Sequence, residues 1–197
     1  MTILILGGGG REHALAWKLA RSPEAPLLVA APGNPGIAAL AECRAADIED
    51  PAAVLALARD VGAGLVVVGP EAPLAAGVSD ALAAAGVAVF GPSAAAARLE
   101  TSKTFAKEVA AAVGAPTAAW ARFDDLAAAR AHLAATGAPI VVKADGLAAG
   151  KGVTVAETLA EAEAALDALF AVPGAACVVE ERMQGPEASL FVLCDGE

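Results

Sequence analysis

Residues 2–17 read TILILGGGGREHALAW: an apolar run, four glycines, and a segment whose apolar positions recur with helical spacing. The run 2–6 has the length and composition of a buried strand. The glycines let the backbone turn tightly and approach a ligand closely. Because the first turn of a helix offers amide N–H groups and positive potential, we expect this turn to contact an anion, typically a phosphate, with Arg11 adding charge.

The same order of strand, glycine turn and helix is typical of dinucleotide-binding proteins, but the sequence departs from their motif. The G-x-G-x-x-G spacing fails because Glu12 or His13 occupies its last position. The next expected strand, 27–31, is followed by Pro32-Gly33-Asn34, with no acidic residue to hold a ribose. Dinucleotide binding is therefore disfavoured, and a tight turn that binds nothing remains the structural alternative.

Strands and helices alternate through the first half of the chain. Buried apolar strands that alternate with helices indicate an α/β fold with a parallel sheet covered on both faces. The loop Gly69-Pro70-Glu71-Ala72-Pro73 follows one of these strands, at the sheet edge where open α/β sheets bind ligands, although a plain connector explains it equally well. We expect strands at 2–6, 27–31, 65–68 and 87–90, and helices at 11–21, 51–61 and 74–85.

The pattern changes after about residue 98. The spacing predicts helices and an antiparallel sheet, with Asp124 as an N-cap and with Thr158 and Glu161 forming a capping box. We expect helices at 101–113, 124–135 and 158–170, and strands at 139–143, 153–156, 176–180 and 188–193.

A loop of small residues, 144–152, lies between two of these strands, with Lys143 before it and Lys151 near its end. Small residues let backbone amides wrap phosphate oxygens, and lysines neutralise their charge. The loop is not a Walker A motif. A glycine hairpin with solvated lysines explains it less well, because Lys143 ends an apolar strand. Glu180 and Glu181 end a later strand, and alone they would indicate only surface charge.

Composition excludes several classes of function. The net charge of −10 and the isoelectric point of about 4.6 disfavour a general nucleic-acid surface and a polybasic membrane patch. The apolar runs are far shorter than the roughly 20 residues of a membrane-spanning helix. The three cysteines show neither a disulfide framework nor metal-ligand spacing, and the start has no basic region of a signal peptide, so we expect a reducing cytoplasm.

The motifs together resemble the phosphoribosylamine–glycine ligase family of the ATP-grasp superfamily. The stretch APIVVKADGLAAGKGV at 138–153 is the most specific match. The other matching stretches are GGGREHALAW at 8–17, APGNPG at 31–36, VVGPEAPL at 67–74, LETSKTF at 99–105 and residues 179–189.

The resemblance implies a reaction in which ATP, glycine and 5-phosphoribosylamine give glycinamide ribonucleotide, ADP and phosphate, with magnesium, or manganese in its place, as the metal. It implies that ATP is bound by Lys103, Lys143, Gly146, Ala149, Gly150, Lys151, Gly152, Glu180, Glu181, Met183 and Glu187. It implies that the phosphoribosylamine side is formed by Gly8, Gly9, Gly10, Arg11, Glu12, Pro70, Glu71 and Pro73.

The resemblance also implies the domain organisation. Residues 1–100 would form a pre-ATP-grasp domain with a parallel sheet, and residues 101–197 part of an ATP-grasp domain: a linker helix at 101–114, a small α+β lid at about 117–190 and the start of a core strand to 197. Family members are longer, so we expect a truncated ligase whose metal ligands lie outside this chain. Nothing in the sequence indicates an oligomeric state.

Two other functions remain open. The chain could be a stand-alone nucleotide-binding module without catalysis, or another ATP-grasp ligase that joins a carboxylate to an amine. A direct substrate assay separates the latter from the ligase of glycine and 5-phosphoribosylamine.

Overall fold

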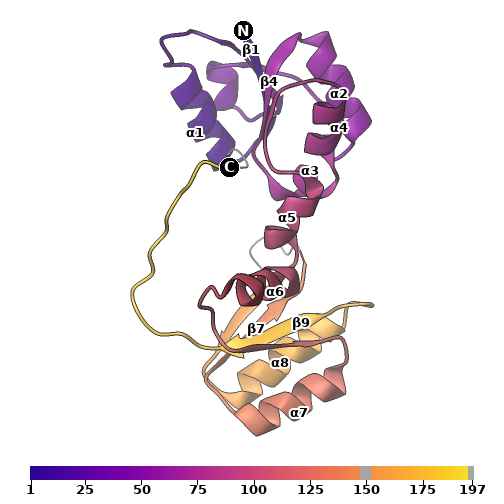
Figure 1. Cartoon of the computed structure of the whole chain (residues 1–197), viewed down its shortest axis with the longest axis vertical. Coiled ribbons are helices and arrows are strands. Elements are labelled where there is room, and N and C mark those ends of the chain that lie inside the picture. Colours follow the sequence, from indigo (N-terminus) through magenta and orange to yellow (C-terminus); the bar gives the residue numbers. More distant parts are fainter. Residues whose placement is uncertain (147–151, 195–197) are drawn as a thin grey trace. The chain divides into compact units, whose positions relative to one another are not determined.

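The computed structural model describes residues 1–146 and 152–194, and the chain divides into two compact units, Met1–Val109 and Ala110–Glu197. Each unit contains one sheet and its helices (Figure 1). The expected α/β class, with a parallel and then an antiparallel sheet, is confirmed. The domain boundary expected at residue 100 stays a prediction.

The first unit is built on a five-stranded parallel sheet of order β3-β2-β1-β4-β5. The chain runs outward from β1 to β3 and then returns past β1 to β4, so the strand order reverses between β1 and β4. The strands are β1 (Thr2–Gly7), β2 (Leu27–Pro32), β3 (Glu42–Cys43), β4 (Ala63–Val68) and β5 (Val89–Phe90).

Helices cover both faces of this sheet, because alternate residues of the central strands point to opposite sides. Leu4 and Leu6 pack on one face in a cluster that includes residues of α2 and α4, whereas Ile3 and Ile5 pack on the other with α1 and a 3-10 helix. Figure 1 shows α1 on one side of β1 and β4, and α2 and α4 on the other. The helices are α1 (Gly10–Leu19), the 3-10 helix η1 (Ile37–Ala39), α2 (Pro51–Asp60), α3 (Glu71–Ala75), α4 (Val78–Ala84) and α5 (Ala94–Thr101).

Two predicted helices differ from the structure in this region. The helix expected at 74–85 is two helices, because Gly77 adopts a left-handed conformation with φ of 84° between α3 and α4. The helix expected from residue 101 starts at Lys103 as α6 (Lys103–Val113), and extended Ser102 separates it from α5, which was not predicted. The 3-10 helix and the two-residue strand β3 were not predicted either.

The second unit has a four-stranded antiparallel sheet of order β6-β9-β7-β8. Two helices cover one face, where Ile140, Val142 and Val179 pack against Leu133 and Leu166. In Figure 1 these helices lie together along one side of β7 and β9. The elements are β6 (Trp120–Phe123), α7 (Leu126–Thr136), β7 (Ile140–Ala144), β8 (Val153–Ala156), α8 (Leu159–Phe170) and β9 (Cys177–Glu181).

The capping box of Thr158 and Glu161 is confirmed, but two other predictions for this unit are wrong. The N-cap of α7 is Asp125 rather than Asp124, since the Asp125 carboxylate accepts from the Ala128 N–H at 2.8 Å. The strand expected at 188–193, the start of a core strand, is irregular chain with exposed side chains. A strand needs a neighbour to pair its backbone groups, and no strand of residues 1–146 or 152–194 pairs with this segment.

Within the described part of the chain, none of the helices combines the length and the apolar character needed to cross a membrane.

Candidate functional site

The first candidate site lies where the strand order of the parallel sheet reverses. In open α/β sheets the crevice at the carboxyl ends of the two strands flanking this point binds ligands. Here the glycine turn follows β1 and the loop of Gly69, Pro70 and Glu71 follows β4. The Gly69 N–H donates to the Leu6 carbonyl at 3.1 Å, which holds the two loops side by side.

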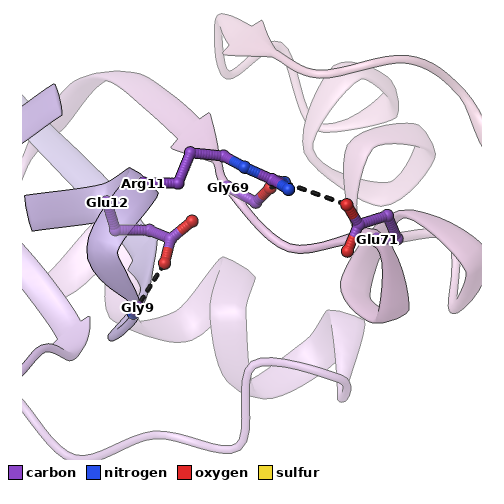
Figure 2. Close-up of polar contacts among 5 residues, drawn as sticks. All are labelled: Gly9, Arg11, Glu12, Gly69 and Glu71. Atoms are coloured by element: carbon purple, nitrogen blue, oxygen red, sulfur yellow. Dashed lines mark hydrogen bonds and ion pairs between the residues drawn. The ribbon is translucent and has the colours of Figure 1, made fainter. Parts of the chain in front are cut away.

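Arg11 joins these loops. Its Nη1 donates to the Gly69 carbonyl at 2.6 Å and to Glu71 Oε1 at 2.9 Å (Figure 2). The pKa of Glu71 is lowered from its ordinary value of 4.5, first by hydrogen bonding from its own backbone N–H and then by Arg11. Glu71 in turn raises the pKa of Arg11. Both side chains are therefore charged at neutral pH and partly exposed at the mouth of the crevice.

Glu12 is buried beneath Arg11, with only 4% of its surface exposed. Its Oε2 accepts from the Gly9 N–H at 2.7 Å, as Figure 2 shows, so the third residue of α1 caps the start of its own helix. Glycines surround this carboxylate: a Cβ would lie 2.7 Å from the nearest Glu12 atom if added at Gly7, 2.8 Å at Gly9 and 2.2 Å at Gly69. With Glu12 in this position, a side chain at any of these three glycines would force the carboxylate to shift.

Asn34, which sequence reasoning did not assign to the site, holds the glycine turn from the side of β2. Its Nδ2 donates to the Gly8 carbonyl at 2.9 Å, and its Oδ1 accepts from the Ile37 N–H at 2.9 Å. Gly8 packs so closely here that an added Cβ would lie 2.4 Å from the Gly33 carbonyl oxygen. The signal was available in the APGNPG stretch, because Asn between glycine and proline commonly bonds neighbouring backbone in turns.

These loops surround a cavity of about 310 Å³, at the small end of the range for ligand sites. Two of the residues predicted for the substrate side, Gly8 and Pro73, do not line it: Gly8 packs against Gly33, and Pro73 is buried in α3. The lining residues are Gly9, Gly10, Arg11, Glu12, Pro70 and Glu71.

The second candidate site lies on the face of the antiparallel sheet opposite α7 and α8. Lys143 is paired with Val178, and Val141 with Glu180, so Lys143 and Glu180 are diagonal neighbours on one face. Their side chains form an ion pair. The Glu180 side chain is 3% exposed and that of Lys143 31%. A partly exposed cation therefore lies over a buried carboxylate, near the carboxyl end of the internal strand β7.

The other residues predicted to bind ATP come from several further segments of the chain. Ala149, Gly150 and Lys151 lie outside the described residues, while Gly146 and Gly152 flank them. Glu181 is exposed at the end of β9, and Met183 and Glu187 follow it in irregular, exposed chain. Lys103 begins α6. Among residues 1–146 and 152–194, no three His, Cys, Asp or Glu side chains are grouped to hold a metal ion.

Curated relatives match the chain over its whole length. It is 61% identical to a phosphoribosylamine–glycine ligase of Mesorhizobium japonicum over 200 residues, which cover 100% of this chain and 47% of the relative. It is 55% identical to the Streptomyces coelicolor enzyme of the same name, covering 100% of this chain and 46% of that enzyme. The chain thus spans somewhat less than half the length of these relatives.

Solved structures share the fold. The phosphoribosylamine–glycine ligase of Thermotoga maritima has a TM-score of 0.74 and 28% identity, over 94% of this chain and 45% of that one. D-alanine–D-alanine ligase of Bacillus anthracis, with a TM-score of 0.69 and 17% identity over 94% of this chain and 58% of that one, shows the fold alone.

Family models complete the comparison. The N domain of phosphoribosylglycinamide synthetase matches residues 1–100, and the ATP-grasp (A) domain of the same enzyme matches residues 101–197. The chain therefore belongs to the phosphoribosylglycinamide synthetase family.

Proposed function

We propose that the chain is part of an enzyme that uses ATP to ligate glycine to 5-phosphoribosylamine, giving glycinamide ribonucleotide, ADP and phosphate in de novo purine synthesis. The observation that carries this proposal is the 61% identity, over the whole chain, to a relative named for that reaction. As part of this pathway the protein would work in the cytoplasm.

The cavity between the glycine turn and the Gly69–Glu71 loop suits the phosphoribosylamine side. Its position at the reversal of strand order, its volume of about 310 Å³ and its ring of backbone and charged groups support a small polar ligand. Arg11 and Glu71 would orient this ligand, since both are charged and partly exposed. Gly8 and Pro73 do not line the cavity, and they would contribute by holding the backbone of the two loops in place.

Lys143 suits the ATP side. An ammonium at the end of a strand, beside a loop of small residues, would hold phosphate oxygens by charge-assisted hydrogen bonds. The other predicted ATP-side roles stay proposals: phosphate contacts for Lys103 and for the loop Gly146, Ala149, Gly150, Lys151 and Gly152, an adenine-side hinge at Glu180, Glu181 and Met183, and ribose contacts from Glu187. Magnesium would accompany the nucleotide and offset charge on its phosphates; we assign it no ligand in this chain.

Positioning and electrostatics would drive the chemistry. ATP would phosphorylate the glycine carboxylate, and the amine of 5-phosphoribosylamine would then attack the acyl phosphate, releasing phosphate. The residues of this chain would hold ATP and 5-phosphoribosylamine, the two phosphate-bearing substrates, in place.

Calorimetric titration with MgATP tests the proposal. Lys143→Ala should weaken binding by about 10-fold or more, since a hydrogen bond to a charged group contributes about 1.5–3 kcal/mol. Because this change also removes the cation paired with buried Glu180, the double variant Lys143→Ala/Glu180→Gln should be measured beside it. Lys18→Ala, on exposed α1 surface, is the matched control and should bind as the unmodified chain does.

Formation of glycinamide ribonucleotide should be assayed on the same sample. Binding without turnover would support a nucleotide site whose catalytic partners lie beyond this chain, or a nucleotide-binding module without catalysis. Turnover would establish activity in the chain itself. Unchanged affinity in both Lys143 variants would contradict the phosphate-contact role.

A further inference from the structure

The first turn of α1 already holds an anion of its own. Helix N-termini attract phosphates because their amides and dipole favour negative charge. Here the Glu12 carboxylate occupies that place and accepts from the Gly9 N–H at 2.7 Å. The Gly9 N–H, one of the donors that a bound phosphate would use, is therefore already bonded to the Glu12 side chain.

Packing holds this carboxylate in position. Glu12 is 4% exposed, and its atoms fill the space that a Cβ would need at Gly7, Gly9 or Gly69. Three backbone segments thus enclose the side chain. Moving it aside for a ligand would open a void between β1, α1 and the loop after β4, which packing disfavours.

The charges around the cavity point the same way. Arg11 is the one cation among its lining residues, and its Nη1 is already shared between the Gly69 carbonyl and Glu71. Two carboxylates, Glu12 and Glu71, face that single cation. A phosphate dianion placed at the glycine turn would meet more negative than positive charge, whereas hydroxyl groups would find acceptors.

We propose that Glu12 determines the specificity of this cavity by closing the glycine turn to phosphate, so that the turn receives an uncharged, hydroxyl-bearing group of the ligand. This proposal replaces the phosphate contact expected from the glycine-rich sequence. Only the identity of the ligand as a sugar phosphate rests on the proposed function. Glu12 acts through its charge and its buried position at the wall of the cavity, and it is a positioning residue rather than a catalytic one.

Amide NMR titration of the ¹⁵N-labelled full chain with inorganic phosphate tests the role of Glu12. In the unmodified chain, the Gly9, Gly10 and Arg11 amides should show no saturable shift. The variant Glu12→Gln keeps a side-chain oxygen for the Gly9 N–H but removes the charge. In this variant the shifts of the same amides should saturate, with an affinity for phosphate at least 10-fold higher than that of the unmodified chain. The amide spectrum itself reports whether the variant is folded.

Glu161→Gln is the matched control, because Glu161 occupies the same capping-box position at the start of α8 and loses the same charge. It should leave the phosphate response of Gly9, Gly10 and Arg11 unchanged. Saturable phosphate binding at these amides in the unmodified chain would overturn the proposal even if Glu12→Gln did not fold. So would a folded Glu12→Gln that gains no phosphate binding.

A parallel titration with ribose 5-phosphate separates this proposal from the proposed function. Shifts at the glycine turn with ribose 5-phosphate but not with inorganic phosphate would support both. No shift with ribose 5-phosphate would count against the substrate side, while the comparison of Glu12→Gln with the unmodified chain would still decide the role of Glu12.

Discussion

Gly8 shows how narrowly the glycine turn is constrained. An added Cβ would lie 2.4 Å from the Gly33 carbonyl oxygen, which is part of the backbone and cannot rotate away. Gly10, two residues later, has nothing within 4 Å of an added Cβ and stands in the first turn of α1. Gly8 therefore has no room for a side chain, whereas Gly10 has.

Gly8→Ala should destabilise the first unit by about 1–3 kcal/mol, the usual cost of forcing extra atoms into a packed region. Gly10→Ala should raise stability by about 0.4–1 kcal/mol, because alanine restricts the unfolded chain more than glycine does. Urea unfolding followed by Trp17 fluorescence, in a Trp120→Phe background, measures both. Equal effects of the two substitutions would show that the turn relaxes away from Gly33.

Motif reasoning assigned Arg11, Glu12 and Glu71 to one site, and the structure brings them together. It missed that Glu12 caps its own helix, because the capping residue, Gly9, lacks the Ser or Thr that marks a capping box. At Thr158 the same spacing of three residues to Glu161 was recognisable. A capping box has two hydrogen bonds, and α1 has only the one in which the carboxylate of the third helical residue accepts from the backbone N–H of the cap. Glu12 makes this bond from a buried position.

At the scale of elements, α7 offers a direct comparison of two adjacent carboxylates. Asp125 caps the helix through the Ala128 N–H, whereas Asp124 forms an exposed ion pair with Arg122 at 3.0 Å. Asp125→Ala should lower the free energy of unfolding by about 1 kcal/mol. Asp124→Ala should lower it by a few tenths, since exposed ion pairs contribute about 0–1 kcal/mol. Urea unfolding followed by Trp120 fluorescence, in a Trp17→Phe background, measures both. A larger effect at Asp124 would show that Asp124, as predicted from the sequence, is the N-cap.

Helices and strands with a sustained apolar pattern were predictable. Short elements, and those that depend on one residue's conformation or on a pairing partner, were not. The strands β1, β4 and β7 are continuous apolar runs, a pattern consistent with buried strands, and each pairs with neighbouring strands. The break at Gly77 depends on a left-handed glycine in an alanine-rich segment that would otherwise continue as a helix. The apolar segment 188–193 has strand composition, but composition supplies no partner for its backbone.

For the molecule as a whole, the net charge does not describe the local charge at the two candidate sites. The chain carries a net charge of −10, yet cations stand at both candidate sites: Arg11 between two loops, and Lys143 over Glu180. Local geometry decides these positions, since only folding brings residues 11 and 71, or 143 and 180, together. Sequence reasoning could name the residues but could not see that each cation already faces a carboxylate.

Whether the second unit folds in a chain that spans less than half of its relatives can be measured through one thiol. Cys177 is fully buried in the core of that unit, and burial raises its pKa to about 11, whereas Cys43 and Cys194 are exposed. Because the thiolate is the reactive form, Cys177 should stay neutral and unreactive in the folded protein at every pH well below 11.

In a Cys43→Ser/Cys194→Ser variant, Cys177 should therefore react with an aromatic disulfide reagent only on local or global opening, at a rate that urea increases. The same variant unfolded in urea is the control, and its thiol should react fully within the mixing experiment. Reaction in the absence of urea at the rate of the unfolded control would show that residues 110–197 do not hold their core in this chain, and it would remove the structural basis for placing Lys143 against Glu180.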